Sequence, residues 1–463
     1  MKNLILLFML FLFIFPAQAQ TTISSIIVNG NSRTKKSIIL RELSFEENKS
    51  YSRDDLVKRI KEGKESLVNL KLFNFVEINK IEENNKAEVT IEVIEKWYVW
   101  PYPIFEISER NFNTWWQEFK ATNYADFSRL NYGIFFNWEN FRGRNELLKL
   151  KIRKGFKEQY LLAYQAPYLN KNKTLGLNTR LQFFRRKKTF YKTVKNDLMY
   201  YENKNNDTYT SEDYEINFNL LYRKGIHKKH TLKFYYFNSV VSDSITILNS
   251  NYLNNNQSSG AYFKTTYQFT NEQRDYTIYP LHGYLLDFEL SKYFQKTIPV
   301  NHFELKARGE KHIELKKKLF LGSSFAIKLS SEDNQPYLIQ RGFGFKDYVR
   351  GYEYYVVDGQ QFWLSKTAIK YALVEKTIFE IPYVKMRQFK KSHYSIYLGI
   401  FSDMGYIYDL PHSTTNPLQS RLLWGKGFSL DYITYYDQLL RIEYSVNQLG
   451  EKGVFLHFSN PFG

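Results

Sequence analysis

Cysteine is absent from the 463-residue chain. This absence excludes a disulfide framework, a thiolate metal site and a cysteine nucleophile. Long apolar runs are also missing beyond the first residues, because no later window approaches the roughly 18 apolar residues that a membrane-spanning helix needs. A helical membrane protein is therefore excluded. A hydrophobic content of 43% and a charged content of 24% exclude a wholly disordered chain.

Aromatic side chains are abundant: tyrosine and phenylalanine each occur 38 times, and tryptophan occurs 7 times. The mean hydropathy is nevertheless -0.48. The formal charge is +18, but residues 20–97 are nearly neutral, so almost all of the positive charge lies beyond Trp97. The chain is long enough for a small domain followed by one large barrel.

The amino-terminal segment has the pattern of a secretory signal peptide. Lys2 precedes an apolar stretch at residues 4–15, and the small residues Ala17 and Ala19 follow it. We predict a signal peptide at residues 1–19 and export of the mature protein. Because no cysteine follows the apolar stretch, a lipoprotein anchor is excluded.

Residues 20–97 carry a mixed pattern that predicts a small α+β domain. Some short segments alternate apolar with polar residues, and others repeat apolar residues at helical spacing. Thr34 and Ser52 stand where helix caps are expected. We expect the order β-α-α-β-β, with strands at 23–28, 73–78 and 89–93 and with helices capped by Thr34 and Ser52.

Beyond Trp97 the helical periodicity disappears, and segments of about ten residues alternate apolar with polar side chains. Residues 148–153, 286–290 and 439–444 are examples. Such alternation fits a soluble sheet with one wet face. It also fits a transmembrane barrel whose apolar face meets lipid and whose polar face lines a lumen.

Three features favour the barrel. Aromatic residues cluster near expected strand ends, at 234–237 and 432–436, as in the interfacial girdles of membrane barrels. Polar segments such as 202–213 and 249–260 are long and uneven, like extracellular loops. The export signal supplies the compartment. We expect an antiparallel, all-β transmembrane barrel of about 16 strands at residues 98–463, in the outer membrane of a diderm bacterium.

Two parts of the sequence carry a resemblance to a known family. The segments IIVNGNSRTKKSIILREL, LVNLKLFNFVEI and VTIEVIEKW fit the strand, helices and closing strands of a POTRA domain. The remainder resembles the barrel of the outer-membrane assembly and translocation superfamily of the BamA/TamA type, which also includes two-partner secretion pores. The resemblance implies one periplasmic POTRA domain at residues 20–97, where BamA has several.

The most specific barrel motif is Val349-Arg350-Gly351-Tyr352, which matches the V/I-R-G-F/Y motif of the family. In the family this motif caps a long loop that folds back into the lumen, and its Arg reaches acidic residues on the inner wall. An Arg in a partly dewatered lumen needs a carboxylate partner, and its planar fork can hold loop and wall in one register. The resemblance implies that Arg350 has this role.

A second motif, Phe401-x-Asp403-x-Gly405, matches the F-x-D-x-G strand of the family. The resemblance makes Asp403 the expected partner of Arg350 on the barrel wall. Together the two motifs indicate a latch between the lumen loop and the barrel.

The family often places a second acid on the strand after the lumen loop. The best match to that position here is Ala368, in LSKTAIKY, with Glu375 or Glu380 as substitutes. This departure from the family pattern leaves the second contact to Arg350 open.

The carboxyl end fits the terminal β-signal of outer-membrane barrels, in which a polar residue is followed by a glycine, here Gly453, and then by apolar residues two positions apart. We expect Leu456 and Phe458 to face lipid and Gly453 to weaken the strand pairing locally. In the family, the seam between the first and last strands is short of hydrogen bonds and can open sideways, so that an incoming barrel strand can add to its edge.

Motifs of enzymes, cofactors and metals are weak or missing. Gly342-Phe343-Gly344 lacks the third glycine of a dinucleotide fingerprint, and no G-x-S-x-G elbow or P-loop occurs. His227 and His230 flank two lysines without a third ligand. We expect no enzymatic activity, no cofactor and no metal. The positive charge is spread over alternating strands without a recognition module, so we also expect no nucleic acid.

The resemblance implies that the protein assembles, inserts or translocates other polypeptides at the outer membrane. The POTRA domain would receive the substrate, and the barrel would act as an insertase. The implied partners are unfolded outer-membrane or secreted polypeptides, outer-membrane lipid, and periplasmic or lipoprotein accessory subunits. Two alternatives stay open: a two-partner-type secretion pore for a dedicated substrate, and an accessory structural barrel of an envelope complex.

Overall fold

The computed structural model describes residues 20–107, 112–124, 130–203, 209–331, 335–408 and 416–459. The predicted signal peptide at residues 1–19 lies outside these ranges. The chain divides into two compact units, residues 1–95 and 96–463. In the described parts of both units, no helix is long and apolar enough to cross a membrane.

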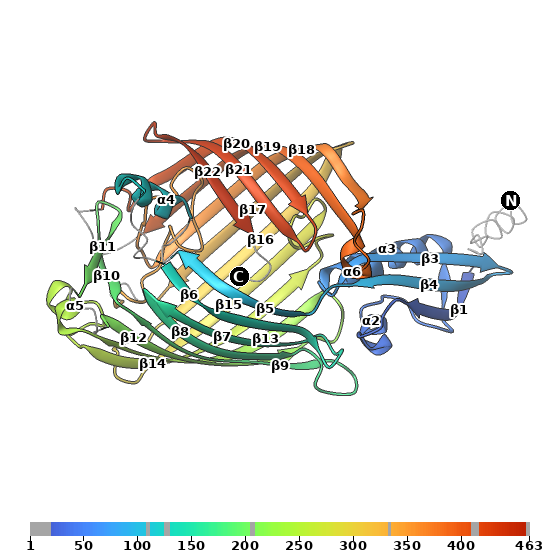
Figure 1. Ribbon diagram of the computed structural model, residues 1–463, viewed down its shortest axis with the longest axis horizontal. Helices are drawn as coiled ribbons and strands as arrows, with labels where there is room; N and C mark the ends of the chain where they lie inside the picture. Colours follow the sequence, from blue (N-terminus) through green and yellow to red (C-terminus); the bar gives the residue numbers. More distant parts are fainter. Residues whose placement is uncertain are drawn as a thin grey trace, which may run out of the picture. The chain divides into compact units, whose positions relative to one another are not determined.

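The first unit is a four-stranded sheet with two helices (Figure 1). Its strand order is β2-β1-β4-β3, in which β1 and β4 are parallel and the other neighbours are antiparallel. The elements are β1 (Gln20–Asn29), α2 (Lys36–Arg41), β2 (Ser50–Ser52), α3 (Arg53–Asn69), β3 (Phe73–Glu83) and β4 (Lys86–Glu95). Sequence periodicity predicted this order apart from β2, which has only three residues and therefore shows no period.

The two predicted helix caps behave differently. Ser52 caps α3, because its side chain accepts a hydrogen bond from the Asp55 backbone N–H at 3.3 Å. The cap predicted at Thr34 is wrong: Lys35 is the N-cap residue of α2, and no side chain caps this helix. The Thr34 N–H instead donates to the carboxylate of Glu95 at 2.6 Å.

Glu95, at the end of β4, binds the turn that precedes α2. Its buried carboxylate also accepts hydrogen bonds from the Ser32 hydroxyl at 2.8 Å and from the Arg33 backbone N–H at 3.0 Å. One charged acceptor therefore satisfies three donors from a turn that has no regular structure of its own.

We predict that Glu95→Ala lowers the free energy of unfolding of the first unit by about 2 to 3 kcal/mol, because three donors lose a charged acceptor. Urea unfolding of residues 20–97, followed by far-ultraviolet circular dichroism, measures the change. Glu92→Ala is the matched control, since Glu92 lies on the same strand but is exposed. Equal unfolding midpoints for the two variants would contradict the prediction.

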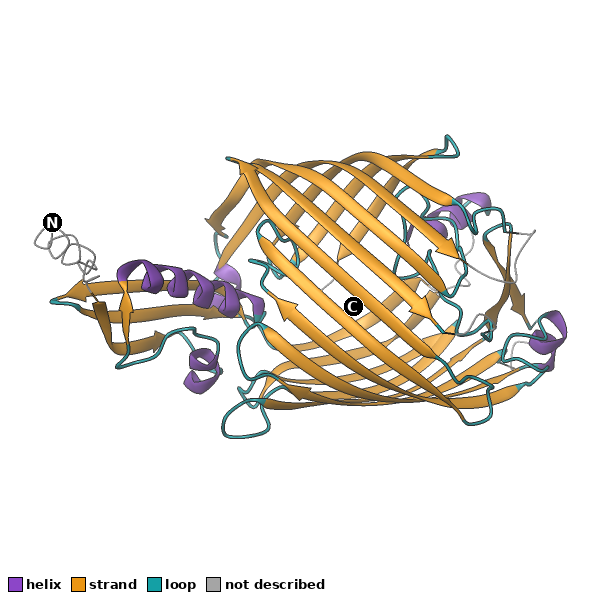
Figure 2. Ribbon diagram, turned by 180° about the vertical axis from the view of Figure 1, so that it is seen from behind, coloured by secondary structure: helices purple, strands orange, loops and turns teal. Residues whose placement is uncertain are grey.

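The second unit is a 16-stranded antiparallel sheet rolled into a barrel (Figures 1 and 2). This confirms the predicted fold class and strand count. The strands are β5 (Val99–Ile107), β6 (Leu130–Phe141), β7 (Glu146–Gly155), β8 (Lys157–Ala166), β9 (Leu175–Arg186), β12 (Ser211–Tyr222), β13 (Lys228–Val241), β14 (Ser259–Glu272), β15 (Gly283–Gln295), β16 (Phe303–Lys316), β17 (Leu319–Ser330), β18 (Gln361–Glu380), β19 (Lys391–Tyr408), β20 (Leu422–Thr434), β21 (Gln438–Asn447) and β22 (Lys452–Ser459).

Smaller elements lie in the connections between the strands. They are α4 (Phe112–Ala121), the hairpin of β10 (Lys188–Val194) and β11 (Asp197–Glu202), α5 (Asp243–Leu248) and α6 (Arg387–Lys390). The connection between β17 and β18 has no helix or strand in its described residues, 335–360.

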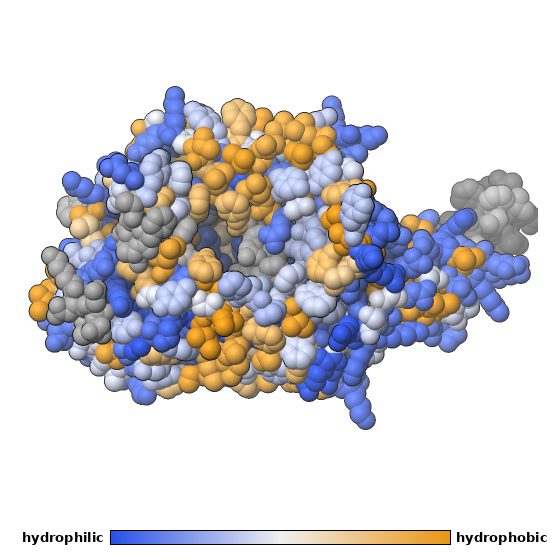
Figure 3. All heavy atoms as spheres, viewed as in Figure 1, coloured by the Kyte–Doolittle hydropathy of each residue, from blue (hydrophilic) through white to orange (hydrophobic). Residues whose placement is uncertain are grey.

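The barrel wall has an apolar outer face and a polar inner face. On β12 the exposed side chains are aromatic or aliphatic at every second position, Tyr214 to Tyr222, and Asp213 on the opposite face is buried. Apolar side chains also cover much of the barrel face seen in Figure 3. A two-residue period with apolar groups outward is the pattern that a lipid-facing wall requires.

The sheet ends at β5 on one side and at β22 on the other. Every other strand of the barrel has two neighbours, whereas no ladder joins β5 to β22 in the residues that the structure describes. Figure 1 shows the two strands on the same side of the rolled sheet. We call these two edges, which no strand ladder joins in the described residues, the seam.

Candidate functional site

The site is built where the loop of residues 335–360 meets the inner wall of the barrel. Val349 and Tyr352 of the loop are buried in an apolar cluster with residues from strands β18, β19 and β20, namely Phe362, Leu364, Ile407 and Leu423. The motif predicted to cap a lumen loop therefore lies in a loop packed against the inside of the barrel.

Two wall glycines allow this close approach. A Cβ atom on Gly425 of β20 would lie 1.7 Å from the carbonyl oxygen of Arg350. A Cβ atom on Gly405 of β19 would lie 2.7 Å from the ring of Phe343 and 2.8 Å from Val349. Any larger residue at either position would displace the loop, so the glycines set how near the Arg350 backbone comes to the wall.

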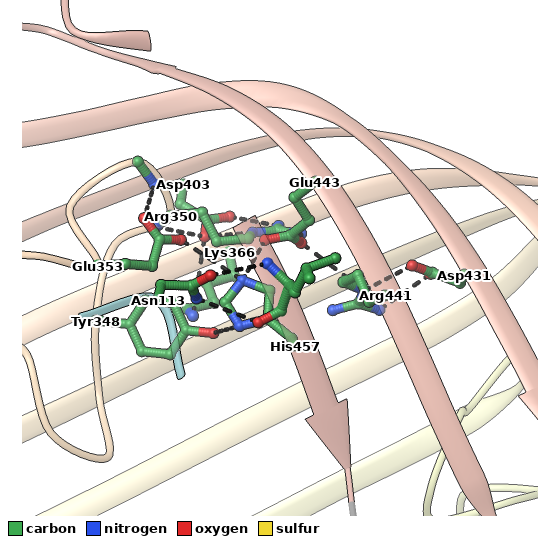
Figure 4. Close-up of polar contacts among 12 residues, drawn as sticks. Asn113, Tyr348, Arg350, Glu353, Lys366, Asp403, Asp431, Arg441, Glu443 and His457 are labelled. Carbon is green, nitrogen blue, oxygen red and sulfur yellow. Dashed lines mark hydrogen bonds and ion pairs between the residues drawn. The ribbon is translucent and has the colours of Figure 1, made fainter. Parts of the chain in front are cut away.

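Arg350 donates two parallel hydrogen bonds to Asp403 (Figure 4). Its Nε and Nη2 atoms each donate to one carboxylate oxygen at 2.7 Å. The guanidinium carbon also lies 3.7 Å from the ring centre of Phe401. Asp403 is fully buried and Arg350 is 7% exposed. This bidentate geometry fixes both the distance and the orientation of the loop relative to β19.

Glu443 on β21 is the second carboxylate at Arg350, whose Nη1 donates to it at 3.2 Å. The sequence left this contact open, because Ala368 occupies the matching position, and neither of the two substitutes, Glu375 and Glu380, makes it. Ala368 pairs with Phe401 in the ladder between β18 and β19. Glu375 and Glu380 are 62% exposed and lie beside Lys318 and Lys390.

Ionic contacts continue along the inner wall from β18 to β21 (Figure 4). Lys366 on β18 lies 3.9 Å from Asp403, and Arg441 on β21 donates to Asp431 on β20 at 2.6 Å. Arg441 also lies 3.7 Å from Glu443. Alternation in the sequence could have placed Arg441 and Glu443 on one face of a strand, but only the closed barrel brings that face to Arg350.

The last strand joins this network through His457 on β22. Its Nε2 atom lies 2.9 Å from a carboxylate oxygen of Glu443 and 3.7 Å from Glu353 in the loop. The ligand atoms of these three residues lie within 4.8 Å of one another, which is close enough for them to share a metal ion. The same atoms also suit ion pairs with a protonated His457. Either way, one cluster connects the lumen loop to the strand that borders the seam.

The remaining predicted residues lie close to this network. Gly351 has a positive φ of 92° at the loop tip, and its carbonyl accepts a hydrogen bond from the Asn447 side chain at 3.0 Å. Gly453, Leu456 and Phe458 all belong to β22. Phe458 is 63% exposed on the outer face. The roles predicted for these residues stay predictions.

We predict that Arg350→Ala lowers the free energy of unfolding of the barrel by about 3 to 5 kcal/mol, because Asp403 and Glu443 stay buried without their main cation. The temperature at which the barrel loses its compact mobility on a denaturing gel measures this change. The transition temperature of Arg350→Lys should lie between those of the unmodified protein and Arg350→Ala, because lysine keeps the positive charge but cannot form the two parallel hydrogen bonds of a guanidinium.

Arg308→Ala is the matched control for this variant. Arg308 also pairs with a lumen carboxylate, Glu310, but its side chain is 50% exposed. A surface-type pair of this kind contributes little to stability. If Arg350→Ala and Arg308→Ala shifted the transition equally, Arg350 would have no special part in holding the barrel.

Comparisons with known proteins agree with this fold. Residues 21–96 match the family model described as "POTRA: Surface antigen variable number repeat". The crystal structure of BamA from Haemophilus ducreyi lacking POTRA domains 1-3 is 13% identical, with a TM-score of 0.51, over 95% of this chain and 84% of that one. CdiB from Escherichia coli is 11% identical, with a TM-score of 0.55, over 95% and 75%. No curated protein matches the sequence.

Proposed function

Because this chain is a POTRA-barrel protein with the fold of BamA and CdiB, we propose that it assembles other polypeptides into the outer membrane at the seam between β5 and β22. The observation that carries this proposal is the edge of β22 that no strand of the described residues pairs. This strand pairs with β21 on one side and with no strand on the other among the described residues. An extended polypeptide can add to such an edge through main-chain hydrogen bonds.

In this proposal the first unit receives the substrate in the periplasm. Within the part of the chain that the structure describes, its outer strand β3 pairs with β4 alone, and the opposite edge of the sheet is the three-residue strand β2. The long edge of β3 therefore offers backbone groups to an unfolded chain, whose own backbone groups are unpaired. The near-neutral charge of residues 20–97 suits substrates of either sign.

The latch at Arg350 favours assembly at the seam over passage through the lumen. A secretion pore would require the loop of residues 335–360 to leave the lumen. That movement would expose the buried carboxylates of Asp403 and Glu443 and the apolar cluster around Val349. Insertion at the seam leaves all of these contacts in place, so its barrier is lower.

We predict that the full-length protein in liposomes speeds the folding of an unfolded test barrel by about tenfold or more, because a barrier lowered by about 1.4 kcal/mol has that effect. The compact gel mobility of the test barrel measures its folding. Deleting residues 20–95 should abolish the acceleration while the remaining barrel keeps its own heat-modifiable mobility.

Conductance measured on the same liposomes separates the alternatives. Large steady conductance without any acceleration of folding would favour a dedicated secretion pore. Neither conductance nor acceleration, with the barrel intact, would favour an accessory structural barrel that works as part of a larger envelope complex.

A further inference from the structure

The helix α4 lies against the edge of β22 that faces the seam, although the two are more than 300 residues apart in sequence. It follows β5 in the chain and carries four aromatic residues on ten positions, Phe112, Trp115, Trp116 and Phe119. The Trp115 and Phe119 rings stack at 4.7 Å. The ring of Phe112 meets that of Phe458 on β22 at 6.1 Å. The helix thus places a cluster of aromatic side chains beside the seam.

Asn113 makes the polar contact between the helix and the strand. Its side-chain nitrogen donates to the carbonyl oxygen of Leu456 at 3.1 Å, and its side-chain oxygen accepts from the Leu456 N–H at 3.1 Å. The Asn113 side chain is 7% exposed. One carboxamide therefore satisfies both backbone groups of a single residue.

This contact reproduces one rung of an antiparallel ladder. A carboxamide offers the same donor and acceptor as a peptide group. Leu456 stands opposite Ile442 of β21, but its N–H and C=O bond to Asn113, so they point away from β21 and toward the seam. In an antiparallel sheet the backbone groups of every second residue point to the same side. Leu456 is thus the residue at which a further strand would pair.

We propose that Asn113 holds the place of a strand residue, so that α4 is a cover over the edge of β22 which an incoming extended polypeptide must displace. The partner of this surface is the backbone of an extended polypeptide segment, read by its N–H and C=O groups and not by its side chains. This inference rests on the proposed function, since it names the step at which a substrate strand gains access to the seam.

The packing around α4 is loose enough for the helix to be displaced from the edge of β22. Two cavities of about 460 and 660 Å³ border the helix, and both are also lined by residues of β22. The first includes Phe112, Asn113 and Leu456, and the second includes Thr114 and Phe455. Atoms that line a cavity lack partners on one side and lose that part of the dispersion attraction. The Asn113 carboxamide adds two hydrogen bonds to a helix that borders both cavities.

A locked variant of the full-length protein tests the cover directly. Because the chain has no cysteine, Phe112→Cys with Phe458→Cys introduces the only two thiols, which a cleavable cross-linker can join. The probe is a synthetic peptide with the sequence of residues 452–459 that carries a photo-crosslinking group. Cross-linking the thiols should reduce peptide capture at the seam by about tenfold, and cleavage of the linker should restore it.

Phe218→Cys with Phe234→Cys is the matched control pair. These residues also lie opposite each other on the outer face, but on β12 and β13, away from the seam. Joining them should leave peptide capture unchanged. If both locked pairs captured the peptide as well as the unmodified protein does, α4 would not cover the edge and the proposal would be overturned.

Hydrogen exchange at single amides gives a second readout that does not depend on any substrate. Asn113→Ala should speed exchange of the Leu456 amide by about tenfold. The exchange rate of the Phe455 amide should stay unchanged, because its backbone N–H points toward β21 and not toward α4. Equal exchange of Leu456 in both proteins would overturn the proposal. If the peptide and exchange results hold while the protein fails to accelerate a test barrel, the cover stands and the proposed function falls.

Discussion

A backbone amide inside a lipid bilayer must find its hydrogen-bond partner within the protein, and this constraint shapes the whole barrel. Fourteen of the sixteen strands meet it by pairing on both sides, and β5 and β22 end the sheet. At β22 the pairing of Leu456 comes from a helix side chain. The seam is thus the place where the strongest rule of membrane-protein structure is met by a side chain, in the described residues, and not by a neighbouring strand.

A second buried requirement holds the interior together. Asp403 and Glu443 lie on strands separated by β20, and both carboxylates are desolvated. A single guanidinium from the loop bridges them. Removing Arg350 takes the loop's cation from both buried carboxylates, so this one side chain ties the loop to two strands of the wall. His457 extends the same network to β22, so the ionic contacts run from the lumen loop to the strand at the seam.

Local patterns in the sequence predicted most of the fold. Two-residue alternation predicted a region of strands beyond Trp97, the length of that region predicted about 16 of them, and helical spacing predicted α2 and α3. Paired motifs named Arg350 and Asp403, which the structure brings together. The contacts of Glu443 and Asn113 were not predicted, because their partners lie 93 and 343 residues away in the sequence. A local period carries no information about contacts over such separations. β2 was not predicted because its three residues are too few to display an alternating pattern.

The sequence by itself therefore determined which side chains share one face of a strand, because side chains alternate along every strand whatever the fold around them. It also determined that a buried Arg350 would need a carboxylate. Only the tertiary structure decided which second carboxylate that is, and which strand edges have no strand beside them in the described residues. Both depend on how sixteen strands close, since closure alone sets the neighbours of a lumen-facing side chain and leaves Leu456 with Asn113 as its partner.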